Sequence, residues 1–386
     1  MRKPSLLLIA AAFLLAGGLL YGSYLESDYP AEAPPQPPMP IIRPEPPPRP
    51  VPDNPLAWLV RRLTVREGYH YGGLTVFLVE VSGVSDRTPY LSVQEAVASG
   101  VLTVQEKGAG TVPALTVENK GREPILMLGG EMLLGGKQNR ILREDVLLPA
   151  HSGPVEVPVL CIEQGRWTDR PLGFKGGEPL APLAVRGSAQ ALRPQDEVWE
   201  GVRSYQRDLA VESATGDLQA VHDSPEVRKA LQDYRERFAE HCWRPAAVGM
   251  VVARYGRIVG ADLFCNPALF AKHRDRLLDS YAVDCIAWRG RAVNAEDRIA
   301  PRHLGGAEEF LRRLLRAEYG WRETPGAGRL LTVAGAGVNG SALVYRDNVL
   351  HACVFPELEV IIRRPRPVPP PEPIPLPWPM PGPREE

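Results

Sequence analysis

The sequence predicts an α+β fold, with a β-rich first half, a sandwich or partly open barrel, packed on a second half of helices and β-hairpins. Three observations support this prediction. Short apolar, β-branched runs separated by turn residues fill the first half of the ordered region. Long helical periodicity appears only in the second half. Two proline-rich stretches bound the region on either side.

Proline sets the limits of the ordered region. Of the 41 prolines in 386 residues, 13 lie between Pro30 and Pro55 and 11 between Pro365 and Pro383. Because proline lacks a backbone donor and fixes φ, we expect both stretches to be extended. The sequence therefore predicts five segments: a targeting segment at 1–28, a proline-rich linker at 29–55, a β-rich half at 56–192, an α+β half at 193–362, and a proline-rich tail at 363–386.

The first residues are typical of an export signal. Arg2 and Lys3 precede an uncharged, mostly apolar stretch at 4–25, which is near the length that spans a bilayer. A cleavable signal peptide has the same pattern, but the small residues of a cleavage site occur only inside the apolar run, which favours an uncleaved anchor. Acidic Glu26 and Asp28 follow the stretch, so the charge bias places the body outside the cytoplasm. We expect a membrane-anchored protein, or a secreted one if the signal is cleaved.

The first half contains several predicted strands and one predicted helix. Ser92 and Glu95 form a capping box that opens a short helix, and Gly100 ends it. Apolar and β-branched runs between turn residues predict strands at 74–81, 102–105, 114–118, 125–128, 141–148 and 155–163.

The second half combines helices with hairpins. Ser224-Pro225 and Asn266-Pro267 each supply an N-cap followed by proline, and a third helix is expected through 310–315. Tyr255-Gly256 predicts a tight turn between strands at 250–254 and 257–263. Three further strands, at 330–333, 342–345 and 349–355, are expected to be joined by turns at Asn339-Gly340 and Asp347-Asn348.

Several function classes are excluded by composition and motif context. The formal net charge of −1 gives no basic excess for a nucleic-acid partner. The G-x-G-x-x-G pattern at 335–340 precedes a strand rather than a helix, so it does not predict a dinucleotide site. The five cysteines lack C-x-x-C spacing and are expected to be small buried hydrophobes. No metal site and no cofactor is predicted.

Two polar clusters interrupt the apolar strands of the first half and form the candidate site. They lie at 136–140 and 163–167, and glycines adjoin Glu131 and Lys137. Arg140 and Arg166 are suited to hold phosphate or carboxylate, together with Lys137. The predicted ligand-binding residues are Lys137, Gln138, Asn139, Arg140, Gln164, Arg166 and Trp167.

The same segment supplies candidate catalytic groups. Glu131 or Glu163 is suited to act as an acid or a base, and Trp167 to stack on a base or a sugar. An alternative interpretation is that both clusters are turn residues whose salt bridges tie the strands together. The sequence leaves both interpretations open.

Blocks of this chain resemble a known family. The blocks are GGE, GGKQNR, LLPAHS, CIEQGRW, VGMVVARYGRIVGADLFCNPALF, LLDSYAVDC and LHACVF. They are similar to those of the ARG and rhodanese-phosphatase-superfamily-associated domain, and the resemblance extends over about residues 56–362. The family's association with ADP-ribosylglycohydrolases implies a role near ADP-ribose or related phosphorylated nucleotides.

Three functions follow as alternatives. The first is a membrane-tethered, extracytoplasmic domain that binds a small phosphorylated or anionic ligand, or a partner, in a cleft formed by GGKQNR and EQGRW. The second is a metal-independent enzyme acting on an ADP-ribose-like or other phosphorylated nucleotide. The third is a structural module whose proline-rich tail recruits a protein partner through basic-flanked prolines at 364–367. A solvated spacer is the alternative interpretation of the tail.

Overall fold

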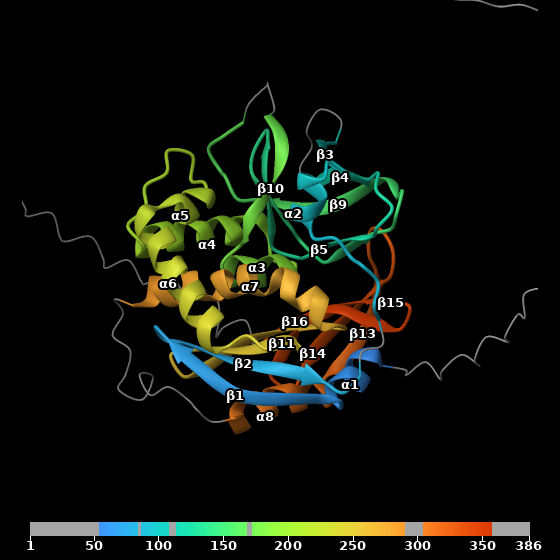
Figure 1. The fold of residues 1–386 in the computed structure, drawn as a ribbon. Helices are drawn as coiled ribbons and strands as arrows, with labels where there is room; N and C mark the ends of the chain where they lie inside the picture. The colour runs from blue at the N-terminus through green and yellow to red at the C-terminus, as the bar shows by residue number, and fades with distance from the viewer. Residues whose placement is uncertain (1–53, 84–85, 108–112, 168–171, 290–303, 357–386) are drawn as a thin grey trace, which may run out of the picture. The chain divides into compact units, whose positions relative to one another are not determined.

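The computed structural model describes residues 54–83, 86–107, 113–167, 172–289 and 304–356 (Figure 1). The described residues all belong to one compact unit within Pro50–Glu386. Within these ranges, no helix combines the length and the hydrophobicity that a membrane span requires. The predicted anchor, most of the linker and the proline-rich tail lie outside the described residues, so the predictions made for them stay predictions.

The larger sheet draws on both halves of the sequence. In the described part of the chain it has eight antiparallel strands, in the order β1-β2-β11-β12-β16-β15-β14-β13. Strand β2 pairs directly with β11, with Phe77 opposite Val251. The strands are β1 Leu63–Tyr71, β2 Leu74–Val81, β11 Ala247–Arg254, β12 Arg257–Phe264, β13 Glu318–Glu323, β14 Arg329–Gly335, β15 Val338–Tyr345 and β16 Asn348–Pro356.

The smaller sheet forms a nearly closed barrel. Its described strands follow the order β10-β6-β7-β9-β4-β3, and the edge strands β10 and β3 contact each other. Side chains such as Leu115, Leu133 and Val157 fill its core. The strands are β3 Leu102–Glu106, β4 Ala114–Asn119, β6 Glu131–Gly136, β7 Arg140–Leu142, β9 Gly153–Cys161 and β10 Leu172–Leu180. A short ribbon of β5 Ile125–Met127 and β8 Val146–Leu148 adjoins it. The predicted α+β class is confirmed.

Helices cover both faces of the larger sheet. Alternate residues of β11 serve the two faces, because Met250 and Val252 belong to one core and Val251 and Ala253 to the other. In Figure 1, α7 lies between the larger sheet and the barrel, and α8 lies on the opposite face of that sheet. The helices are α1 Pro55–Val60, α2 Val93–Ala98, α3 Leu183–Gln190, α4 Gln195–Asp208, α5 Gln219–Asp223, α6 Pro225–His241, α7 Pro267–Trp288 and α8 Leu304–Leu314.

Local signals placed some elements correctly and others incorrectly. The capping box of Ser92 and Glu95 is present, and all five cysteines are buried thiols. The predicted strand at 141–148 is wrong, because the chain breaks there into β7 and β8. The predicted turn at Asn339-Gly340 is also wrong. The β14–β15 hairpin turns at Ala336-Gly337, which both have positive φ, and Asn339 pairs with Ala334 inside the hairpin.

A buried ionic network joins the barrel to the larger sheet. Asp262 on β12 accepts two hydrogen bonds of 3.2 Å from the Arg186 guanidinium and one of 2.7 Å from the Tyr281 hydroxyl. The His351 ring on β16 lies between two carboxylates, with Nε2 3.1 Å from Asp262 Oδ1 and Nδ1 2.8 Å from Asp145 Oδ2. Asp145 lies in the β7–β8 connection of the barrel and also accepts from the Gly129 amide. The network therefore fixes the barrel on the sheet.

The charges of this network shift the pKa of its members. Burial alone would lower the pKa of His351, but Asp145 and Asp262 outweigh it and raise this pKa to about 9. Burial alone would raise the pKa of Asp262, but the Arg186 charge and His351 hold it well below its usual range. At neutral pH, His351 is therefore a cation paired with the Asp262 anion.

We predict that His351 makes folding stability fall at alkaline pH. Its pKa is higher in the folded state, so its stabilising contribution is complete below its ordinary value of 6.5 and is lost as pH rises through about 9. Urea denaturation at several pH values should show a decline of the unfolding free energy across this window, and His351→Gln should flatten it. His241→Gln, an exposed histidine on α6, is the control. An equal decline in wild type and His351→Gln would contradict the prediction.

Candidate functional site

The two predicted polar clusters, 136–140 and 163–167, meet in the structure and are called here the KQNR–EQGRW cluster. Arg166 Nη1 donates to the Gly136 carbonyl at 2.9 Å, and Nη2 donates to Asn139 Oδ1 at 3.1 Å. The Lys137 ammonium lies 4.9 Å from the centroid of the Trp167 ring. The juxtaposition arises because β6 leads into the first cluster and β9 into the second, and β7 lies between these strands.

Most polar groups of the KQNR–EQGRW cluster bind other groups of the protein. The backbone N–H of Asn139 donates to Glu163 Oε2 at 3.1 Å, and the side-chain Nδ2 of Asn139 donates to Asp217 Oδ2 at 2.9 Å. Arg140, only 1% exposed, donates to Gln138 Oε1 at 2.9 Å. These contacts hold the ends of β6, β7 and β9 together and to the loop before α5. A role of these residues in ligand binding stays a prediction.

The solvent-facing part of the cluster is small. Trp167 is 53% exposed and carries the Lys137 ammonium on its ring. Gln164 is exposed, and its Oε1 accepts a hydrogen bond of 3.0 Å from Arg203 on α4. An exposed tryptophan remains available to stack on a partner, whereas the buried members do not.

The two candidate carboxylates lie in different environments. Glu131, at the start of β6, is buried and ion-paired with Arg276 on α7, and burial raises its pKa despite this charge. The two carboxylate oxygens of Glu163 share the Arg166 Nε–H, and each lies 2.8 Å from Nε. Burial opposes ionisation of Glu163, but the Arg166 hydrogen bonds and the Asn139 amide hold its pKa below the ordinary value. A carboxylate with a lowered pKa is a weak general base at neutral pH.

A groove of about 520 Å³, called here the α6 groove, adjoins this region. Strands β6 and β10 form one wall, and helices α5, α6 and α7 form the other. The lining residues are Leu134, Lys175, Pro179, Gln219, His222, Asp223, Arg228, Leu231, Gln232, Arg235 and Asp279. Strand β6 therefore carries Glu131 at one end, contributes Leu134 to the groove and leads into the KQNR–EQGRW cluster.

One face of α6 supplies four of the lining side chains. Ser224 caps the helix and Pro225 begins it. Arg228, Leu231, Gln232 and Arg235 follow at i, i+3, i+4 and i+7, which is a single stripe along a helix. The groove is therefore lined along α6 by charged, apolar and amide side chains in turn.

The charged groups of the α6 groove are unequally paired. Arg235 Nε donates to both oxygens of Asp279, at 2.9 and 3.0 Å, and Asp279 is buried on α7. Arg228 and Lys175 are exposed and have no ion pair with any residue that the structure describes. Two cations thus face the groove without a carboxylate of their own.

His222 is buried in the wall of the α6 groove without a hydrogen-bond partner. The residue is 6% exposed, and neither ring nitrogen has a partner within the described ranges. Burial, followed by the nearby Arg235 charge, lowers its pKa to about 4, so the ring is neutral at pH 7. Gln219 Oε1, on the same helix, also lacks a donor there. The described residues contain other buried polar atoms without a partner, such as the ring nitrogens of His273, but His222 and Gln219 line a groove, where a ligand or solvent can supply the missing partner.

Sequence reasoning missed His222 and the rest of the groove. No motif surrounds His222, and the lining residues come from stretches as distant as Leu134 and Asp279. The helical stripe of α6 was the only local signal, and it also fits a solvated helix face. Among the described residues, no group of three or more metal-ligating side chains is close enough to hold a metal ion.

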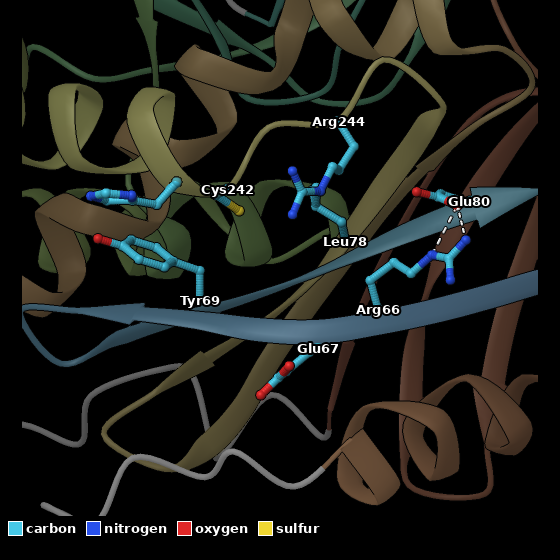
Figure 2. A pocket seen from close by; sticks show the side chains of 8 residues that line it. Arg66, Glu67, Tyr69, Leu78, Glu80, Cys242 and Arg244 are labelled. Atoms are coloured by element: carbon cyan, nitrogen blue, oxygen red, sulfur yellow. Dashed lines mark hydrogen bonds and ion pairs between the residues drawn. The ribbon is translucent and has the colours of Figure 1, made fainter.

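A second groove, of about 400 Å³, lies between the β1–β2 hairpin and the end of α6 (Figure 2). Figure 2 shows that Arg66 is paired with Glu80, with Nε 2.9 Å from Oε2. The Tyr69 and His241 rings pack on each other, with their centroids 5.3 Å apart. Burial raises the pKa of the Cys242 thiol to about 12. Because several of its polar groups already contact each other, this groove is the weaker candidate.

We predict that Arg140→Ala destabilises the protein. Its guanidinium is buried, hydrogen-bonded to Gln138 Oε1 and 3.9 Å from Glu106 Oε1, so its removal leaves Gln138 Oε1 without this donor and Glu106 without its ion-pair partner. The loss should be roughly 3 kcal/mol in urea denaturation. The control Arg203→Ala removes an exposed guanidinium from α4 and should cost under about 1 kcal/mol. Equal stability of both variants would show that the buried contacts of Arg140 contribute little.

Comparison with known proteins identifies the family of the domain but no individual relative. Neither the search of curated proteins nor the search of solved structures found a match. A family model matches residues 62–355, which is most of the chain and includes both sheets and the α6 groove. The chain therefore belongs to the family of the ARG and Rhodanese-Phosphatase-superfamily-associated Protein domain.

Proposed function

We propose that this domain binds a small anionic ligand in the α6 groove. The observation that carries the proposal is the buried, neutral His222 without a hydrogen-bond partner among the described residues, in the wall of a groove with unpaired cations. Buried polar groups in native proteins are paired with protein, water or ligand. A ligand that reaches His222 supplies the missing partner.

The charge of the groove favours an anion. Its described lining contains three cations, Lys175, Arg228 and Arg235, and two carboxylates, Asp223 and Asp279. Arg235 and Asp279 neutralise each other through their hydrogen bonds. Asp223 accepts a hydrogen bond of 3.1 Å from Gln219. Gln219 is a neutral donor, so Asp223 still offsets one of the two other cations, and the three cations and two carboxylates leave one net positive charge. Arg228 suits a phosphate or carboxylate through its paired donors.

The size of the groove fits a small molecule. Its volume of about 520 Å³ falls within the range of roughly 300–1,000 Å³ that is typical of small-ligand sites. Leu134, Pro179 and Leu231 add apolar surface beside the polar groups. Small-ligand sites have this composition of apolar walls with few, specifically placed polar groups.

The proposed place of binding is the extracytoplasmic face of a membrane. Support comes from the sequence pattern of the first 28 residues, a basic start followed by an apolar stretch. On this proposal, the domain is a tethered binding module that meets its ligand outside the cytoplasm.

A tag after Glu386 should then be open to protease in intact cells that carry the protein in their outermost membrane.

We predict that Arg228→Ala weakens binding of inorganic pyrophosphate by about tenfold to a hundredfold, because it removes a charge-assisted hydrogen bond. The matched control is Arg237→Ala, which removes an exposed arginine of the same helix that does not line the groove. Isothermal titration should give wild-type affinity for the control. Equal affinities of the two variants would place the anion elsewhere.

We also predict that binding of sulfate is independent of pH between pH 6 and 8. Sulfate does not change its charge in this range, and His222 is uncharged because its pKa is lowered to about 4. An imidazolium partner would instead make sulfate binding weaken as pH rises through its ordinary pKa of 6.5. Titrations at four pH values test this, and a decline that disappears in His222→Gln would contradict the neutral imidazole.

A further inference from the structure

We infer that the ligand of the α6 groove is a small polyhydroxylated anion, with the chemistry of a sugar phosphate or a sugar acid, and that it is not a nucleotide. The inference rests on the proposed function and adds the chemical class of the uncharged part of the ligand. Three features of the groove support it: the unmet hydrogen-bonding groups, the aliphatic walls and the position of the unpaired cations.

The unmet groups need both donors and acceptors. A neutral imidazole has one N–H donor and one nitrogen acceptor, so His222 needs a ligand acceptor and a ligand donor. Gln219 Oε1 needs a further donor. A fully ionised phosphate or carboxylate only accepts hydrogen bonds and leaves the two acceptors unmet. Hydroxyl groups donate and accept, so neighbouring hydroxyls of a polyol satisfy His222 and Gln219 together.

The walls of the groove are aliphatic. Leu134, Pro179 and Leu231 provide its apolar surface, and the described lining contains no Phe, Tyr or Trp. Proteins that hold unpaired bases commonly stack them on aromatic faces. The C–H surface of a sugar needs no such platform. The lining therefore favours a polyol over a purine or pyrimidine base.

The cation and the unmet groups are close along the chain. His222 lies near the end of α5, Ser224 caps α6, and Arg228 follows in the second turn of α6. Arg228 and Arg235 are seven residues apart, about 10 Å along the helix, and Arg235 is held by Asp279. An anionic group at Arg228 thus places the uncharged part of the ligand against α5.

Isothermal titration with four probes tests the inference: glucose 6-phosphate, inorganic phosphate, glucose and adenosine monophosphate. We expect glucose 6-phosphate to bind at least tenfold more tightly than inorganic phosphate and than adenosine monophosphate. His222→Leu and Gln219→Ala should each reduce this advantage, measured as the ratio of the two affinities in the same variant. Two variants are used because His222 is buried, whereas Gln219 is partly exposed and its exchange is a milder test of folding.

The outcomes separate the inference from the proposed function. If glucose 6-phosphate and inorganic phosphate bind equally and both depend on Arg228, the polyol inference is wrong and the anion site stands. If adenosine monophosphate binds most tightly, the ligand class is a nucleotide and the inference is overturned. If none of the three phosphate compounds binds to the wild-type protein, the proposed anion site itself is wrong.

Discussion

The carboxylate of Asp262 is the constraint on which the arrangement of the domain depends. It is fully buried, and an isolated charge at such a position is strongly destabilising. Arg186, Tyr281 and His351 compensate it with hydrogen bonds from α3, α7 and β16. Because His351 also contacts Asp145 of the barrel, the barrel has to sit where this chain of charges stays complete. Removal of one partner from such a buried pair leaves an uncompensated charge and is strongly destabilising.

Helix α7 connects this network to the candidate site. It presents Tyr281 to Asp262, Arg276 to Glu131 at the start of β6, and Asp279 to Arg235 in the α6 groove. A displacement of α7 would disturb the barrel, the network and the groove together. The groove is therefore built on a position that the core already fixes, as an organised binding site requires.

The contrast between the KQNR–EQGRW cluster and the α6 groove shows how polarity in a sequence relates to exposure. The cluster is the most conspicuous polar feature of the first half of the sequence. Its Arg140 and Asn139, however, donate their hydrogen bonds to Gln138 and Glu163 of the same cluster. The groove residues look ordinary along the chain, and His222 acquires its unpaired state only because the fold encloses it. A dense run of polar residues in a sequence can therefore indicate hydrogen bonds and ion pairs within the protein as readily as it indicates a ligand-binding site.

The sequence alone determined part of the local elements, the α+β class and the family. Caps at Ser92, Ser224 and Asn266, alternation in strands and turn residues act within a few positions, so they are readable without a structure. The sequence predicted one cleft from the two polar clusters on the condition that their strands lie side by side, and the clusters meet because only β7 lies between β6 and β9. The tertiary structure alone decided the pairing of β2 with β11, the burial of the charge on Asp262 and the assembly of the α6 groove. These depend on contacts between residues far apart in the chain, and no local propensity encodes which distant partner completes a sheet or leaves a histidine without one.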